Sequence, residues 1–473
     1  MEHAYFIRLA PWMCFPNAHP HDLMWPCSIL YCASLAEKCG WNARILDCHV
    51  QHETPDSLSK YIFVSKPTMV FIDTMTTTIH WAIELAELIK TQLPRVQIWG
   101  IGQHASENPQ DFLFPDSSFQ GVIRGEPEAV ITELLTHPEK KDIPGCCYWD
   151  DDVDSSSTER VKVQELDALP PIRPLDLHLD RYRLQSANVP RFGKLRWGFL
   201  LTSRGCPYPC TFCSPTLRQS YGRDFRMQSA EKVVDDMSRL HGDYQIDAFY
   251  MIDDVFSLDK GRIEQICQLL IQRRLKISWV IQTRADLIDR ELCLLLKKAG
   301  CSGIKMGIES GSPRILSQIR KNLTPEKILE GVRAIQDAEL NLTTYYMLGH
   351  PSETAQEMEE TFQFAQKVNA DMIQVAFHTP YPGSPDWEDL GHGVRDFSQL
   401  NHYETQHVNL SEVEDSVLEA MQRNFYLRYY LQPRILKKYL RKRFIYQVSD
   451  PREWNLLTKT FTYLVVNREK GIV

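Results

Sequence analysis

Three cysteines lie close together in the sequence, and their thiols are the groups in this chain best suited to chemistry. Cys206, Cys210 and Cys213 follow the spacing C-x3-C-x2-C. The glycine and proline residues around them disfavour a helix, so the segment can form a loop that wraps round a bound group. Soft thiolates of this kind select zinc, copper(I) or an iron–sulfur cluster.

The number of thiols favours an iron–sulfur cluster. A closed structural zinc site needs a fourth ligand nearby, and the next candidate in the sequence is His241. Three thiolates on a four-iron cluster leave one iron open, and an open iron can bind and reduce a cosubstrate. A structural zinc knuckle is the alternative.

The other cysteines are scattered, and we expect them to be small hydrophobic core residues. The total of 13 is odd. The N-terminal sequence has no basic segment followed by an apolar run, and no apolar stretch approaches the roughly 18 residues of a membrane span. We therefore expect a cytoplasmic protein with reduced thiols. Cys14 and Cys48, on loops near the expected ligand-binding ends of strands, are the two most open to another role.

The composition is that of a large globular protein. The chain has 473 residues, of which 43% are hydrophobic, with 53 Lys and Arg against 61 Asp and Glu and a formal net charge of −8. At roughly 150 residues per domain, this length predicts two to three domains. The mild negative charge argues against nucleic acid as a partner.

Short apolar runs alternate with helical patterns over the first 135 residues or so. This order predicts parallel βαβ units and a doubly wound, flavodoxin-like sheet. Ligands of such sheets bind beyond the carboxyl ends of the strands. The expected strands are 5–9, 44–50, 69–74, 96–100 and 120–124, with helices at 23–39 and 81–90.

The same alternation returns from residue 197 with longer units. Six strand–helix repeats predict a partial, six-stranded TIM-like barrel, whose catalytic groups would gather at the carboxyl ends of the strands. Cys206, Asp253, Arg284 and Glu309 fall at such ends. The expected strands are 197–203, 248–253, 278–284, 303–310, 341–348 and 372–378.

The predicted division of the chain has four parts. An acidic, Ser-rich stretch and a Pro-rich stretch separate the two alternating regions, and the last segment has no strand pattern. We expect a doubly wound domain at 1–140, a linker at 141–194, a barrel at 195–395 and a helical segment at 396–473.

The cysteine loop resembles the signature of the radical S-adenosylmethionine (SAM) superfamily. Phe212 stands before the last cysteine, where that family has an aromatic residue, and Asp253 with Asp254 matches its acidic turn after the second strand. The similarity covers about residues 195–385 in the right order. Three later strand-end motifs match as well, at 306–311, 348–353 and 380–384.

This resemblance implies a 4Fe–4S cluster on Cys206, Cys210 and Cys213, with SAM beside it. A carboxylate would accept from the amino group of SAM, a guanidinium would bind its carboxylate, an acid would accept from its ribose and an aromatic ring would face its adenine. The implied SAM-binding residues are Phe212, Asp253, Asp254, Arg284, Glu309 and Ser310.

Ordinary structural roles are the alternatives for four of these residues. Arg284 and Glu309 could form a salt bridge within the barrel. Asp253 or Asp254 could be a helix N-cap.

The doubly wound domain is similar to the cobalamin-binding domain of the cobalamin-dependent branch of this superfamily. Glycines would let the backbone approach a large flat ligand. Cobalamin domains that ligate cobalt from below have the motif Asp-x-His-x-x-Gly after the first strand. This chain lacks it, since Asp47-Cys48-His49 follows the second strand and lacks the glycine. We therefore expect no lower histidine ligand to cobalt. The implied cobalamin-binding residues are Thr74, Thr76, Gly100, Gly102, His104 and Glu126. The alternative is a domain that only shapes the substrate cavity.

The resemblance implies an enzyme that reductively cleaves SAM and abstracts hydrogen from an unactivated carbon, with methyl transfer through cobalamin. Radical cyclisation, ring rearrangement or oxidation of a natural-product or lipid-like substrate is the alternative. A sensor or scaffold with a silent barrel is a third possibility, against which the intact cysteine triplet argues. An electron donor such as flavodoxin or ferredoxin is the implied partner.

A basic, aromatic run at 423–447 has two interpretations. It could be an amphipathic helix that contacts a membrane surface, which would suit a lipid-like substrate. More often, such a run is a solvated helix that covers the barrel.

Overall fold

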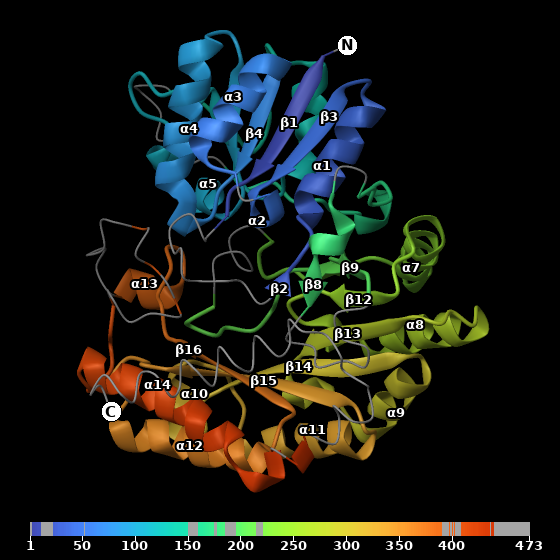
Figure 1. Cartoon of the computed structure of the whole chain (residues 1–473), viewed down its shortest axis with the longest axis vertical. Coiled ribbons are helices and arrows are strands. Elements are labelled where there is room, and N and C mark those ends of the chain that lie inside the picture. The colour runs from blue at the N-terminus through green and yellow to red at the C-terminus, as the bar shows by residue number, and fades with distance from the viewer. Residues whose placement is uncertain are drawn as a thin grey trace.

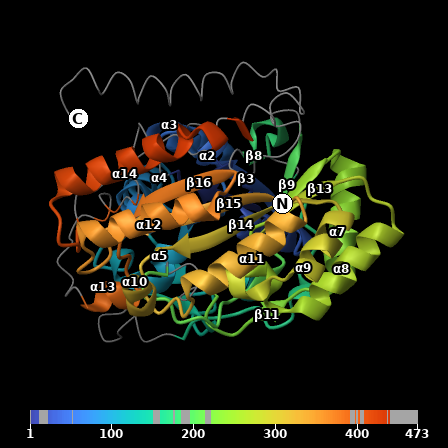
Figure 2. The ribbon, with the colours of Figure 1, turned by 90° about the horizontal axis from the view of Figure 1, so that it is seen from below.

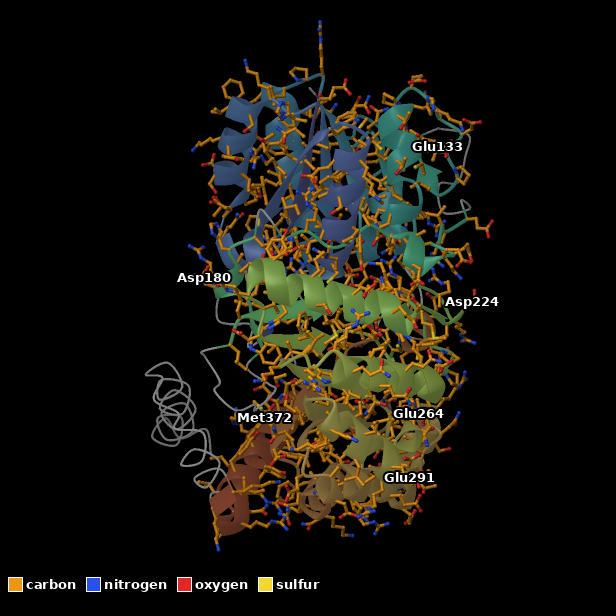
Figure 3. All side chains as sticks on the ribbon, turned by 90° about the vertical axis from the view of Figure 1, so that its right-hand side faces the viewer. Glu133, Asp180, Asp224, Glu264, Glu291 and Met372 are labelled. Carbon is orange, nitrogen blue, oxygen red and sulfur yellow. The ribbon has the colours of Figure 1, made fainter. Side chains whose placement is uncertain are left out.

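The computed structural model shows one sheet-based layer stacked on another (Figure 1). Side chains fill the space between them, and Asp224 lies near their boundary while Glu133 and Glu291 lie on the two opposite layers (Figure 3). The residues that the structure describes are 2–10, 22–51, 53–149, 159–174, 177–184, 195–213, 221–389, 397, 400, 402, 408–435 and 437–438. Cys14 lies outside them, as do residues 436 and 439–447 of the run at 423–447.

The N-terminal layer is a six-stranded sheet in the order β3-β1-β4-β5-β6-β7. The first five strands are parallel neighbours, and β7 is antiparallel to β6. The strands are β1 (His3–Arg8), β3 (Asn42–Asp47), β4 (Met69–Asp73), β5 (Gln97–Ile101), β6 (Gly121–Ile123) and β7 (Cys146–Cys147).

Alternate residues of these strands build two cores, one on each face of the sheet. In β1, Ala4 and Phe6 belong to one core, and Tyr5 and Ile7 belong to the other. The first core takes in α1 (Cys27–Lys38) and α6 (Ile131–Thr136), and the second takes in α3 (Pro55–Ser65) and α4 (Ile79–Gln92). Burial on both faces explains the continuous apolar runs in the sequence. The predicted doubly wound sheet is confirmed.

The second layer is a parallel six-stranded sheet in the order β16-β15-β14-β13-β12-β9. Sequential order with helical crossovers makes it the predicted partial barrel, open between β9 and β16. The strands are β9 (Trp197–Leu200), β12 (Ala248–Met251), β13 (Ser278–Thr283), β14 (Cys301–Glu309), β15 (Asn341–Leu348) and β16 (Met372–Phe377). The helices are α7 (Ala230–Tyr244), α8 (Lys260–Gln272), α9 (Arg290–Lys298), α10 (Pro313–Gln318), α11 (Pro325–Asp337) and α12 (Ala355–Val368).

The barrel helices begin where the sequence supplies a capping side chain. A Ser, Thr or Asp before each helix accepts a hydrogen bond from a backbone N–H of its first turn, which fixes the start of the helix. These caps are Ser229, Asp259, Asp289, Ser312, Thr324 and Thr354. Each cap follows the loop at one end of the barrel and so limits how far that loop can extend.

The described helix of the C-terminal segment lies along the edge of the barrel. α14 (Asp415–Tyr430) runs beside α12 and β16 (Figure 2). The backbone N–H groups of Ile373 and Val375 donate to the hydroxyls of Tyr430 at 3.0 Å and Tyr426 at 2.7 Å. The described part of the basic, aromatic run thus covers the barrel. The part of the chain that the structure describes contains no helix that could span a membrane.

We predict that removing both of these hydroxyls destabilises the edge strand. The double variant Tyr426→Phe/Tyr430→Phe leaves two strand N–H groups without their present acceptors, at about 1 kcal/mol each. Its urea midpoint should fall, and amide hydrogen exchange should accelerate at 372–377. Tyr61→Phe, at a ring that is 50% exposed, is the matched control. Unchanged exchange at 372–377 in the double variant would contradict the role given to the hydroxyls.

Candidate functional site

The three clustered cysteines lie on a loop that a two-stranded ribbon closes. β10 (Ser203–Arg204) and β11 (Arg226–Met227) pair antiparallel at the two ends of the loop. Gly205 turns the chain with φ +87°, and a Cβ there would lie 2.2 Å from the carbonyl oxygen of Asp224. Only glycine fits this turn, which sets the direction in which the loop leaves the ribbon.

The loop is pinned to the barrel beside its cysteines. The N–H of Thr211 donates to the carbonyl of Ile319 at 3.1 Å. Cys206 and Cys210 are buried, Cys213 is partly buried, and no cysteine in the described part forms a disulfide. Within that part, no three His, Cys, Asp or Glu side chains gather as they would round one metal ion. Three thiols on one pinned loop are a donor set that suits an iron–sulfur cluster.

The two acids after β12 have different surroundings. Asp253 accepts hydrogen bonds at 2.6 Å from the N–H and hydroxyl of Thr202 and from the hydroxyl of Ser203, so it ties β12 to β9. Asp254 Oδ2 is buried and has no hydrogen-bond partner. Burial, with a smaller contribution from Asp253, raises the pKa of Asp254 to about 8. Neither acid caps a helix, because Asp259 caps α8. Asp254 is therefore the one with acceptor capacity left.

Arg284 and Glu309 both form salt bridges and share one neighbour. Arg284 binds Asp286 through Nε at 3.0 Å. Its guanidinium carbon lies 3.6 Å from the ring centre of Tyr208 on the cysteine loop. Its Nη2 also donates to the carbonyl of Lys321 at 3.0 Å. The ammonium of Lys321 donates to Glu309 at 2.9 Å. The alternative considered for this pair, salt bridges in the barrel, is present, although not between the two.

Lys321 was missed by sequence reasoning. Its ammonium lies 6.0 Å from the ring centre of Phe212, and Lys321 is 6% exposed. It therefore connects the predicted partners of the carboxylate, ribose and adenine of SAM. Nothing in the sequence marks this lysine, because it follows a short helix and belongs to no motif.

Glu309 has a strained backbone at the end of β14. Its φ is +72°, a conformation that costs a non-glycine residue about 1–3 kcal/mol. The pairing of β14 with β15 shifts register between Gly307 and Glu309. A Cβ on Gly307 would lie 2.3 Å from Glu309 Oε1, so the carboxylate folds back over that glycine. The surrounding contacts hold it in this position.

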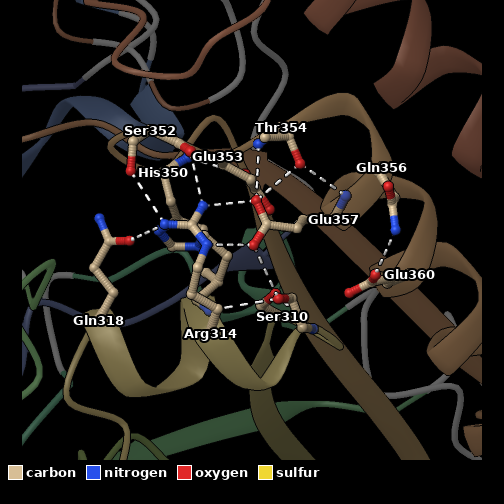
Figure 4. Close-up of polar contacts among 12 residues, drawn as sticks. Ser310, Arg314, Gln318, His350, Ser352, Glu353, Thr354, Gln356, Glu357 and Glu360 are labelled. Carbon is tan, nitrogen blue, oxygen red and sulfur yellow. Dashed lines mark hydrogen bonds and ion pairs between the residues drawn. The ribbon is translucent and has the colours of Figure 1, made fainter.

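Ser310 belongs to a polar scaffold beside the site. Its hydroxyl pairs with that of Thr361 on α12 at 3.0 Å and accepts from the N–H of Ser312. Arg314 continues this scaffold by binding Glu357 at the start of α12 (Figure 4). The polar atoms of Ser310 are thus used to join β14 to α12.

A pair of histidines at the ends of β15 and β16 was also missed. His350 is fully buried, and neither ring nitrogen has a hydrogen-bond partner. Its ring centre lies 5.2 Å from that of His378 and 6.4 Å from that of Phe212. His378 Nε2 pairs with Asp386 at 2.8 Å. Burial lowers the pKa of His350 well below its usual value, so His350 is neutral and keeps one donor and one acceptor.

Three of the predicted cobalamin residues meet at the carboxyl ends of β4 and β5. The N–H of His104 donates to the carbonyl of Thr74 at 3.1 Å. A Cβ on Gly102, which has φ +94°, would lie 2.1 Å from Asp73 Oδ1. His104 Nε2 pairs with Asp111 at 2.9 Å, and its Nδ1 is buried without a partner. This buried nitrogen at the ligand-binding end of the sheet is the feature that fits a bound cofactor.

The other three predicted cobalamin residues have different surroundings. Thr76 is buried at the start of the short helical turn Thr76–Thr78. Gly100 is inside β5, where a Cβ would lie 2.8 Å from the side chain of Val122. Glu126 pairs with Arg204 and Arg226 from the barrel layer. Gly100 therefore serves packing within the sheet, and Glu126 joins the two layers.

The C-terminal segment supplies a second link between the layers. The ring of Phe397 stacks edge-on to His104 at 5.1 Å and lies 6.1 Å from Trp387. Trp387 belongs to α13 (Pro385–Asp389), which lies between the two layers (Figure 1). The ends of both sheets thus face one shared junction that aromatic residues cover on this side.

Two family models match the chain, one in each layer. The radical SAM superfamily matches residues 200–365, and the B12 binding domain matches residues 17–135. An uncharacterised methyltransferase of Pyrococcus horikoshii is 30% identical over 421 residues, which cover 87% of this chain and 89% of that protein. An anaerobic magnesium-protoporphyrin IX monomethyl ester cyclase of Rubrivivax gelatinosus is 26% identical over 448 residues, which cover 89% and 77%.

Solved structures share the same two-layer fold. The cobalamin-dependent SAM radical enzyme OxsB matches with a TM-score of 0.72 and 19% identity over 100% of this chain and 72% of its own. The radical SAM methyltransferase TsrM from Kitasatospora setae matches with a TM-score of 0.62 and 18% identity over 81% and 75%. At these identities, the likeness shows the fold.

We predict that Asp254 lowers the stability of the cofactor-free protein as the pH rises. Its folded-state pKa of about 8 lies above the unfolded value, so its favourable contribution is complete below about pH 4 and is lost as the pH rises to about 8, at about 1.4 kcal/mol per unit. Relative to the wild type, the urea midpoint of Asp254→Asn should therefore rise as the pH is increased from 5 to 9. If the difference between the two urea midpoints stays constant across this range, the carboxyl of Asp254 is not buried without a partner as described.

Proposed function

Since the chain belongs to the family of cobalamin-dependent radical SAM enzymes, we propose that it transfers a methyl group to an unactivated carbon of a small-molecule substrate. The cofactors of this family are a 4Fe–4S cluster, SAM and cobalamin. When bound, the cluster with SAM supplies a radical that removes a hydrogen atom, and cobalamin supplies the methyl group. We further propose that flavodoxin or ferredoxin donates the electron.

One observation carries the proposal: the cysteine loop and the ligand-binding end of the N-terminal sheet face the same junction. Arg204, two residues before Cys206, contacts Glu126 just beyond the end of β6. On the other side, Phe397 bridges His104 and Trp387. A substrate held in this junction would lie between both sets of cofactor residues and away from bulk water.

The residues round the cysteine loop suit the groups of SAM. Asp254 would accept from the ammonium, and that positive charge would favour the ionised carboxylate. Arg284, held by Asp286 and stacked on Tyr208, would bind the carboxylate. Glu309, paired with Lys321, would accept from the ribose, and Phe212 would face the adenine. In this arrangement Asp253 and Ser310 support the neighbouring loops.

Methyl transfer is preferred to cyclisation as the outcome of the reaction. The relative at 30% identity is named a methyltransferase, whereas the relatives named cyclases are 22% to 26% identical. The residues described at the barrel mouth fit either outcome, so the products decide between them. S-adenosylhomocysteine formed together with 5′-deoxyadenosine would support methyl transfer.

We predict that iron binding depends on the clustered cysteines and not on the others. After anaerobic reconstitution, the wild type should bind about four irons per chain and form 5′-deoxyadenosine from SAM under reduction. Cys210→Ala should lose most of the iron, while Cys39→Ser, at a partly buried thiol at the end of α1, should keep it. Zinc in place of iron in the wild type would overturn the proposal.

We predict that corrinoid binding depends on the glycine after β5. In Gly102→Ala the new Cβ must displace the carboxylate of Asp73 and disturb the ends of β4 and β5. Corrinoid content should fall severalfold while iron content stays the same. Gly242→Ala, where a Cβ meets nothing within 4 Å, is the matched control. A wild type that binds no corrinoid would remove methyl transfer and leave the radical reaction.

A further inference from the structure

Four charged side chains meet in the buried boundary between the two layers. Arg204 binds Glu126 at 2.5 Å and Glu128 at 2.7 Å, and Arg226 binds Glu126 at 2.5 Å. Three of these side chains are 0% exposed, and that of Arg226 is 10% exposed. Burial of charge is costly unless each charge has partners, so this group forms only when both layers are in place.

The two arginines are direct neighbours across the ribbon that closes the cysteine loop. Arg204 of β10 and Arg226 of β11 are register partners. Like charges directly opposite each other destabilise an antiparallel pair. The carboxylate of Glu126 accepts from both guanidinium groups through different oxygens. The pairing of this ribbon therefore depends on a side chain from the other layer.

Glu126 is itself held firmly from the N-terminal side. Its N–H donates to the carbonyl of Val161 at 2.9 Å, and its Oε2 accepts from the N–H of Val163 at 3.0 Å. Gly125 has φ +96°, and a Cβ there would lie 2.2 Å from the carbonyl oxygen of Val161. The carboxylate thus comes from a rigid turn just beyond β6 and can act as a fixed point for the ribbon.

Contacts of the ribbon show that the same group reaches into the cysteine loop. The ring centre of Tyr221, near the far end of the loop, lies 5.2 Å from the guanidinium carbon of Arg204. Arg226 Nη2 also donates to the carbonyl of Tyr221 at 3.0 Å. The N–H of Cys206 donates to the carbonyl of Gly222 at 3.3 Å. Loss of the ribbon would therefore free Cys206 from its backbone partner across the loop.

We infer that Glu126 is a positioning residue that keeps the cysteine loop closed, so that the N-terminal domain controls how firmly the loop retains its cluster. The inference rests on the proposed function, because it assigns a cluster to these cysteines. It gives Glu126 a role different from the cofactor contact expected from the sequence. Glu126 acts through Arg204 and Arg226 and touches none of the three cysteines in this account.

The test compares Glu126→Gln with Glu37→Gln in the full-length chain. Glu37 forms an exposed ion pair with Arg173 at 2.6 Å, so the control removes an ion pair of the same domain away from the loop. Two quantities are measured: amide hydrogen exchange at 204–213 in the cofactor-free protein, and the rate at which a chelator removes iron from the reconstituted protein. In Glu126→Gln both should rise about tenfold or more, as expected when buried charges lose a partner, and Glu37→Gln should match the wild type.

A second variant separates positioning from general damage to the fold. Glu126→Gln/Arg226→Met removes the like-charge pair along with the carboxylate, so it should slow exchange and iron loss again relative to Glu126→Gln. Arg226→Met alone should be milder than Glu126→Gln, because Arg204 keeps both glutamates.

Two results would overturn the inference. One is exchange at 204–213 within twofold of the wild type in a folded Glu126→Gln protein, and the other is a double variant that is worse than Glu126→Gln. If Glu126→Gln does not fold, the folded Arg226→Met variant is compared with the wild type instead. Exchange at 204–213 and iron loss should both be faster in the variant, and rates within twofold of the wild type would overturn the inference. A wild type without iron would refute the proposed function, yet the exchange measurement would still report on the ribbon.

Discussion

Charged side chains buried between the two sheets determine how the two layers are positioned relative to each other. Glu126 and Glu128 extend from one layer, and Arg204 and Arg226 extend from the other. Because each of these groups is costly to bury alone, the two layers have one favoured arrangement rather than a sliding contact. That arrangement holds the ribbon of the cysteine loop against the turn that follows β6. In the same arrangement, Phe397 and Trp387 cover the junction between the layers on its other side.

Polar groups at the strand ends divide into those that are satisfied and those that are not. Asp253 and Ser310 have their hydrogen bonds within the protein, and they hold loops together. Asp254 Oδ2 and both ring nitrogens of His350 are buried without partners. Proteins rarely leave buried polar atoms unpaired. This contrast, rather than polarity alone, separates side chains that wait for a ligand from side chains that build the frame.

Sequence reasoning found what depends on local pattern. Apolar runs that alternate with helical patterns located both sheets, and the cysteine spacing located the loop, since these signals lie within a few neighbouring residues. It did not find contacts between distant residues: Arg204 and Glu126 are 78 positions apart, and no local feature links them. The same holds for His350 and His378, which meet because β15 and β16 are neighbours. Glu126 was expected at the cofactor for its place in a strand-end motif, which does not reveal which way a side chain faces.

The open barrel has a consequence for how copies of this protein behave towards each other. A parallel sheet with free edges offers unpaired N–H and C=O groups to a strand from another molecule. At β16, hydroxyls of Tyr426 and Tyr430 occupy the N–H groups of Val375 and Ile373. A second chain would have to displace α14 before it could extend the sheet there. The barrel is thus incomplete in strand number but closed at this edge to polymerisation through strand pairing.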